Sequence, residues 1–144
     1  MIGGAKTRTV EWMLAALMFG WGAAVLYPGE MLGNATNRYL ILLMPEDAWG
    51  VIAAAIGVFR MSFLYVNGAW RRSPIMRLIG CFLGTLWWTA LFALYMRAIN
   101  DGAQVYPSLV FYPTFILFEY FSCFRCAQDA CAMGAFGRTP KENA

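Results

Sequence analysis

Four apolar stretches, each long enough to cross a bilayer, follow one another along this chain of 144 residues. A helix needs about 20 apolar residues to cross the hydrocarbon layer of a membrane, which is about 30 Å thick. We expect the spans at about residues 10–27, 48–66, 78–96 and 106–124. The spans nearly fill the sequence, which therefore predicts a single membrane domain, residues 1–144. Its fold class is an all-α integral membrane protein, a bundle of four transmembrane helices.

Composition agrees with this class. Hydrophobic residues are 60% of the chain and charged residues 13%, whereas a soluble domain carries about 25% charged residues. The basic residues that give the net charge of +3 stand beside the apolar runs and not along one polar face. The partners expected are therefore the lipid bilayer and its anionic lipids, and no nucleic acid.

Two shorter features accompany the spans. Residues 38–44 form an apolar run too short to cross a membrane, and we expect a short interfacial segment there, after the first span. At the start of the first span, Val10 and Glu11 should add a turn at the level of the lipid headgroups. In the last span, Pro113 removes one backbone hydrogen bond and predicts a kink near Tyr112.

The basic residues outside the spans are distributed unevenly, which predicts the orientation. Eight of the ten fall on one side, and the other side holds Arg38 and Arg97 together with four acidic residues. Cytoplasmic loops are enriched in Lys and Arg, so we expect an integral inner-membrane protein with both termini and the tail 125–144 in the cytoplasm. The eight are Lys6, Arg8, Arg71, Arg72, Arg77, Arg125, Arg138 and Lys141.

Two ionisable residues stand inside spans. Arg60 lies seven residues before the end of the second span at Asn67, and Glu119 lies six residues before Arg125. At 1.5 Å per residue, both are about 9–10 Å inside the same boundary. Charges in hydrocarbon are costly and usually face a partner, so equal depth predicts an Arg60–Glu119 ion pair. A structural pair and a proton or ion relay are both open.

The loop before the third span is the most polar segment. Trp70, Arg71, Arg72 and Arg77 are suited to binding an anionic headgroup, and they also serve as a topology signal. The stretch VNGAWRRSPIMRLIGCFLG resembles the loop–helix junction of small multi-span membrane proteins encoded by tailed bacteriophages. The likeness covers about residues 66–88. It implies a phage origin and a holin-like or undefined role, and it assigns no functional residue.

The four cysteines are predicted at the cytoplasmic end. Their spacing matches no standard ligand pattern, and a reducing cytoplasm disfavours disulfides, so we expect no metal site and no cofactor. Quinone-coupled thiol oxidases of the vitamin K epoxide reductase type also use paired cysteines near helix ends, but these face the oxidising side. The residues concerned are Cys81, Cys123, Cys126 and Cys131.

Small residues at helical spacing mark expected helix contacts. Gly80 and Gly84 are four apart in the third span, Ala53 and Gly57 in the second, and Gly20-x-x-x-Ala24 repeats the pattern in the first. Small side chains let two backbones approach closely, either within one chain or between copies in a homo-oligomer.

Three classes of function remain open. The leading one is a non-enzymatic, phage-like inner-membrane protein without catalytic residues, which inserts, oligomerises and permeabilises the bilayer as holins do, or modulates a host membrane process. The second is a membrane thiol oxidoreductase or metal-binding protein that uses the cysteines. The third is a small transporter or channel that uses Arg60 and Glu119.

Overall fold

The computed structural model describes residues 4–69 and 74–132, and the regular structure in these ranges is entirely helical. The all-α prediction is therefore confirmed for this part of the chain. The elements are α1 (Gly4–Val25), η1 (Ala35–Asn37), α2 (Arg38–Leu43), α3 (Glu46–Ala69), α4 (Pro74–Asn100), η2 (Pro107–Val110) and α5 (Phe111–Ala132), where η1 and η2 are 3₁₀ turns.

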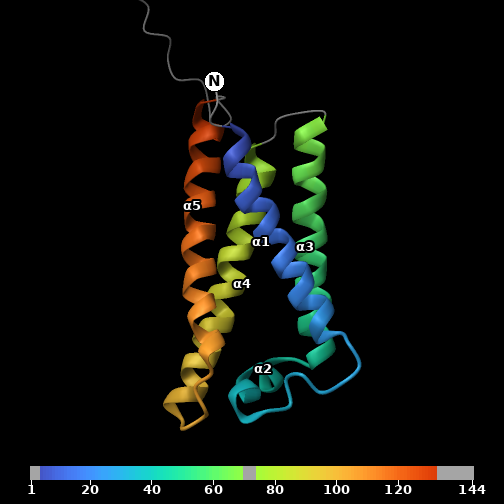
Figure 1. The fold of residues 1–144 in the computed structure, drawn as a ribbon, viewed down its shortest axis with the longest axis vertical. Helices are drawn as coiled ribbons and strands as arrows, with labels where there is room; N and C mark the ends of the chain where they lie inside the picture. Colours follow the sequence, from blue (N-terminus) through green and yellow to red (C-terminus); the bar gives the residue numbers. More distant parts are fainter. Residues whose placement is uncertain (1–3, 70–73, 133–144) are drawn as a thin grey trace, which may run out of the picture.

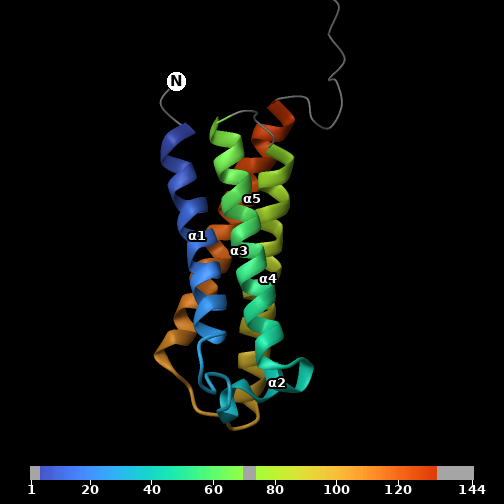
Figure 2. The same ribbon diagram turned by 90° about the vertical axis from the view of Figure 1, so that its right-hand side faces the viewer.

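The four long helices run side by side (Figures 1 and 2). They form two close pairs, α1 with α3 and α4 with α5, and α3 also contacts α4. The start of α1 and the end of α5 lie at the same end, which we call the termini end. The opposite end carries α2 and the connections 26–37 and 101–110, and we call it the loop end. Both described ends of the chain thus lie at one end of the molecule.

Three helical stretches are long and apolar enough to cross a membrane: Glu46–Val66, Ile75–Asn100 and Pro107–Ala132. The second, third and fourth predicted spans thus coincide with helices of sufficient length and hydropathy. Over its described residues, α1 is not one of these stretches. Its 22 residues would extend about 33 Å, so its length is sufficient. Charged residues in its first part, such as Arg8 and Glu11, lower the mean hydropathy of this helix.

The last helix begins later than predicted. Pro107–Val110 form the turn η2, and α5 starts at Phe111, so Pro113 lies in the first helical turn and not inside the helix. The kink expected near Tyr112 is therefore wrong. The first N–H groups of a helix have no intrahelical partner, so proline is tolerated at this place. At its other end α5 continues to Ala132, so the described part of the expected tail, residues 125–132, is helical.

The start of α3 is stabilised as its sequence suggests. Glu46 and Asp47 lie in the first turn, next to the positive end of the helix dipole. The Glu46 carboxylate also accepts hydrogen bonds from the backbone N–H groups of Met31 (2.9 Å) and Leu32 (3.2 Å). These bonds attach the segment after α1 to the base of α3.

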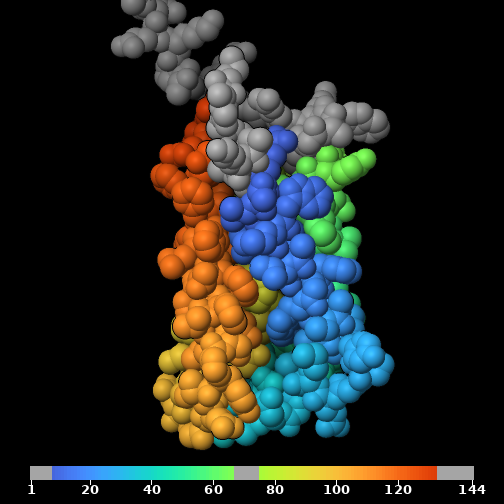
Figure 3. All heavy atoms as spheres, in the orientation of Figure 1, coloured from blue at the N-terminus to red at the C-terminus, as the bar shows by residue number. Residues whose placement is uncertain are grey.

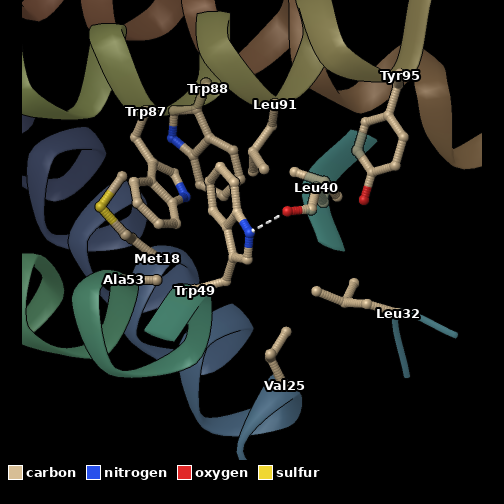
Figure 4. Packing of buried hydrophobic residues seen from close by; sticks show 10 residues of the cluster. All are labelled: Met18, Val25, Leu32, Leu40, Trp49, Ala53, Trp87, Trp88, Leu91 and Tyr95. Carbon is tan, nitrogen blue, oxygen red and sulfur yellow. Dashed lines mark hydrogen bonds between the residues drawn. The ribbon is translucent and has the colours of Figure 1, made fainter. Parts of the chain in front are cut away.

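The hydrophobic core occupies the half of the molecule near the loop end (Figure 4). The indole N–H of Trp49 donates to the carbonyl of Leu40 at 2.9 Å, which anchors α2 to α3. The rings of Trp49 and Trp87 are 5.3 Å apart and meet edge to face. The buried cluster consists of Met18, Val25, Leu32, Leu40, Trp49, Ala53, Trp87, Trp88, Leu91 and Tyr95.

The outer surface is rich in large apolar side chains. On α2, Leu40 is buried while Leu42 is 80% exposed, so the expected interfacial segment is a short helix with an apolar outer face. On α5, Phe115 packs against Trp88 with ring centres 4.9 Å apart. Figure 3 shows α5 in orange on the surface beside α1. The exposed large apolar side chains of α5 include Phe111, Leu117, Phe118, Tyr120, Phe121 and Phe124.

Candidate functional site

Arg60 and Glu119 face each other between α3 and α5, as expected from their equal depth. Arg60 Nη1 donates to Glu119 Oε1 at 2.5 Å and Nη2 donates to Oε2 at 2.8 Å. Both side chains are almost inaccessible, at 3% and 0% exposure. The pair is therefore a buried, bidentate guanidinium–carboxylate contact, in which each carboxylate oxygen accepts one bond from the guanidinium.

Gly80 and Gly84 of α4 make room for this pair. A Cβ added at Gly84 would overlap the Glu119 carboxylate and Arg60 Nη1, and a Cβ at Gly80 would lie 3.2 Å from Arg60 Cγ. The sequence motif was interpreted as a surface for close helix contact. In the structure, these two glycines instead leave space for a charged pair that bridges the helices on either side of α4.

The other small-residue motifs meet at the contact of α1 with α3. Ala53 is fully buried, and a Cβ on Gly57 would overlap the backbone of Phe19. In α1 the contacting glycine is Gly22, which faces Ala54, whereas a Cβ on Gly20 would meet nothing within 4 Å. The packing role expected for Gly20 within the chain is therefore wrong, because residues two apart in a helix lie on opposite faces.

A second charged network lies nearer the termini end. Arg77 donates from Nη2 to Glu11 Oε1 at 2.5 Å and from Nε to Glu11 Oε2 at 2.9 Å. Its Nη1 also donates to Asp129 at 3.2 Å. Glu11 is 2% exposed, so its carboxylate faces the interior of the helix bundle. An acidic residue at the start of an apolar stretch is the sequence feature that could have indicated an internal partner for Glu11.

The predicted lipid-binding residues divide into two groups. The guanidinium of Arg77 is directed into the molecule toward Glu11, so it does not serve as an outward-facing headgroup ligand here. Trp70, Arg71 and Arg72 lie outside the described residues.

Three of the four cysteines gather beside these networks. Cys81 on α4 and Cys126 on α5 are buried, and Cys123 is half-buried, with Sγ 3.8 Å from the hydroxyl of Thr85. The Sγ atoms of Cys81 and Cys126 lie within 4.8 Å of each other, and Cys123 is also a neighbour of Cys81. Cys131 is exposed. The structure thus brings together a group of three thiols and leaves the fourth outside.

At the loop end, an exposed cluster joins α2 to the end of α4. Arg38 pairs with Asp101 at 3.0 Å, and the hydroxyl of Tyr39 donates to the same carboxylate. The guanidinium of Arg97 lies 5.1 Å from the centre of the Tyr39 ring. The pKa of Asp101 is lowered from its ordinary value because Tyr39 donates to its carboxylate and Arg38 is nearby.

A cavity of about 320 Å³ also lies toward the loop end, between the ends of the long helices and the connecting segments. The hydroxyl of Thr36 in its wall donates to the carbonyl of Gln104 at 3.1 Å. All of the described lining side chains are uncharged. They are Trp21, Ala24, Val25, Met31, Leu32, Asn34, Thr36, Asn37, Tyr95, Ile99, Tyr106, Ser108, Leu109 and Tyr112.

No protein-family model matches the chain, and no curated protein or solved structure is significantly similar to it. Its class is therefore defined by its own geometry. Over its described residues it is a helical protein with three helices long and apolar enough to span a membrane. Charged side chains are buried between its helices at one end, and an uncharged cavity lies at the other.

Proposed function

We propose that this chain is an integral protein of the inner membrane, with four membrane-spanning helices and both termini in the cytoplasm. In this proposal it is phage-like and non-enzymatic. It acts by assembling with further copies in the bilayer and permeabilising it, as holins do. The observation that carries the proposal is the distribution of polarity between the inside and the outside of the helices.

This distribution is the reverse of that in a soluble protein. Glu119 is completely buried, whereas Leu117 and Phe124 on the same helix are 70% and 63% exposed. Soluble monomers rarely expose contiguous apolar surface of this kind. In hydrocarbon the same surface is favourable, and charged side chains are expected to face the interior and to pair with one another.

The same reasoning supports α1 as the fourth span. The Glu11 carboxylate of this helix is buried against Arg77 of α4. An internal partner lowers the cost of a carboxylate within the bilayer. With α1 crossing, both described ends of the chain lie on one side, which agrees with the predicted excess of basic residues there.

Assembly of copies would depend on the apolar outer face of α5. Gly80 and Gly84 are occupied by the internal ion pair, so they do not offer a close-contact surface to another copy. The exposed aromatic side chains of α5 remain for contacts between chains or with lipid. Packing of side chains is what drives helix association in lipid, because both helices and lipid are apolar.

Inducible expression tests this proposal. We expect loss of membrane potential, reported by a voltage-sensitive dye, together with a ladder of crosslinked products in native membranes. Phe121→Asp, which places a charge on the exposed face of α5, should abolish both at equal expression. Unchanged membrane potential together with a strictly monomeric crosslinking pattern would contradict the proposal.

The Arg60–Glu119 geometry gives less support to a transporter or channel. Both carboxylate oxygens accept bonds from the guanidinium. A relay group must exchange protons or ions with a chain of further polar groups or water. A sealed bidentate contact is better suited to fixing α3 against α5.

A second candidate function is the binding of a small uncharged molecule in the cavity at the loop end. Its volume of about 320 Å³ falls within the usual range for ligand pockets, and aromatic walls with a few polar groups are typical of them. A molecule that copurifies with the chain, found by mass spectrometry and lost in Leu109→Trp, would support this function. Equal recovery from the variant would contradict it.

A further inference from the structure

Glu11, Cys81 and Cys126 bring a carboxylate and two thiols together from three helices, α1, α4 and α5. Their donor atoms all lie within 4.8 Å of one another, and all three residues are buried. Cys126 Sγ is 3.8 Å from Glu11 Oε1. In a tetrahedral Zn²⁺ site, with Zn–S of about 2.3 Å and Zn–O of about 2.1 Å, a sulfur and an oxygen ligand are about 3.6 Å apart. The spacing of the donors is therefore close to that of a zinc site.

We propose that Glu11, Cys81 and Cys126 bind one Zn²⁺ ion and that the ion ties α1 to the α4–α5 pair. Zinc accepts mixed thiolate and carboxylate ligands, whereas Cu⁺ selects sites made only of soft sulfur donors. The fourth position is left for water. Cys123 approaches Cys81 but is not within the group of mutually close donors, and Cys131 is exposed and separate.

The charge balance favours such a site in a buried place. Glu11 is already paired with Arg77 as a carboxylate, while the two thiols carry protons before metal enters. Binding of Zn²⁺ forms two Zn–S bonds and one Zn–O bond and releases the two thiol protons. Two positive charges enter and two leave, so the net charge of the buried group does not change. Uncompensated charge in an interior is costly, and this exchange adds none.

Arg77 would hold the ligand carboxylate in place. Its Nε donates to Glu11 Oε2, and this bond is retained when Oε1 turns to the metal. Partners of this kind orient metal ligands in known sites. A void of about 10 Å³, bordered by Glu11, Arg77 and Cys81 among others, adjoins the site. That is about the space of one water molecule, which is the ligand left for the fourth position of the ion.

Metal titration of the full-length chain, purified in detergent under reducing conditions and stripped of metal, tests the proposal. We expect one Zn²⁺ per chain, release of about two protons per ion, and a thiolate-to-metal charge-transfer band when Co²⁺ is used instead. Cys81→Ser, Cys126→Ser and Glu11→Gln should each weaken binding by more than about 10-fold. Cys131→Ser is the matched control and should leave affinity within about twofold, since Cys131 lies outside the donor group.

A measurement on the unmodified sequence covers variants that fail to fold. Zn²⁺ should protect Cys81 and Cys126 from alkylation, as read by peptide mass spectrometry, and should leave Cys131 equally reactive with and without metal. Protection of Cys131, no protection of any thiol, or full Zn²⁺ affinity in folded Cys81→Ser would each overturn the proposal. These readouts do not depend on permeabilisation, so their failure is separate from failure of the proposed function.

Discussion

The Arg60 guanidinium of α3 and the Glu119 carboxylate of α5 are joined by two hydrogen bonds directly over Gly84 of α4. One contact thereby involves three of the four long helices. This contact requires a glycine in the middle helix, and it requires two side chains of opposite charge at the same depth in the helices on either side. Changes at any of these three positions should therefore have related effects.

Removal of one partner of the ion pair should be much more harmful than removal of both. Arg60→Leu or Glu119→Leu leaves a buried charge without its partner, and we expect a loss of about 3–5 kcal/mol in the free energy of unfolding. The double variant leaves no unpaired charge and should be clearly milder than the sum of the two. The free energies of unfolding of the unmodified chain, the two single variants and the double variant, measured in detergent, give the coupling between the two side chains. Strictly additive losses would mean that the two side chains do not interact.

Addition of a methyl group at Gly84 should displace the ion pair. A Cβ there overlaps the Glu119 carboxylate, so Gly84→Ala should destabilise the chain by about 1–3 kcal/mol, as overpacking does. Gly20→Ala is the matched control. Its Cβ meets nothing within 4 Å, so it should stabilise the helix by about 0.5–1 kcal/mol.

Crosslinking of the same Gly84 variant separates the two interpretations of the glycine motif. Since Gly84 faces an ion pair within the chain, its substitution should lower the folded yield of single chains and leave any contacts between folded copies as they were. If Gly84→Ala folds normally and only the crosslinked ladder disappears, the glycine lies between copies and not under the ion pair.

Protonation of Asp101 should contribute to the loss of stability in acid. Its carboxylate has a lowered pKa in the folded chain, chiefly because Tyr39 donates to it. At neutral pH the ionised Asp101 carboxylate makes its full contribution to the free energy of unfolding. As the pH falls through about 4, the unfolded chain takes up a proton first. The contribution is lost when the folded carboxylate is protonated as well. The difference in melting temperature between the unmodified chain and Asp101→Asn should therefore narrow as the pH falls. A difference that stays constant from pH 7 to pH 3 would contradict the assignment.

The sequence was sufficient for the features that depend on local pattern. Apolar length predicted the positions of α3, α4 and α5, and counting residues from the helix ends placed Arg60 and Glu119 at equal depth. The start of α5 was missed because Pro113 fits either a kink or a first helical turn, and the local sequence does not distinguish the two.

The group around Glu11 could not be predicted from spacing. Glu11 is separated by 66 residues from Arg77 and by 115 residues from Cys126, and no periodic pattern connects positions so distant. Their contact depends on the rotation of α1 about its axis. The close approach of Gly22 and Gly57 to the facing helices fixes that rotation, and it is a property of packing.

The orientation of the chain in the membrane is the most direct test of the central claim. Paired reporters, one active only in the cytoplasm and one only outside it, are fused at Ala144 and after Asp101 in the full-length chain. We predict cytoplasmic activity at Ala144 and external activity at Asp101, because the basic residues are concentrated on the side of the termini. External activity at Ala144, or the same compartment for both positions, would contradict the account.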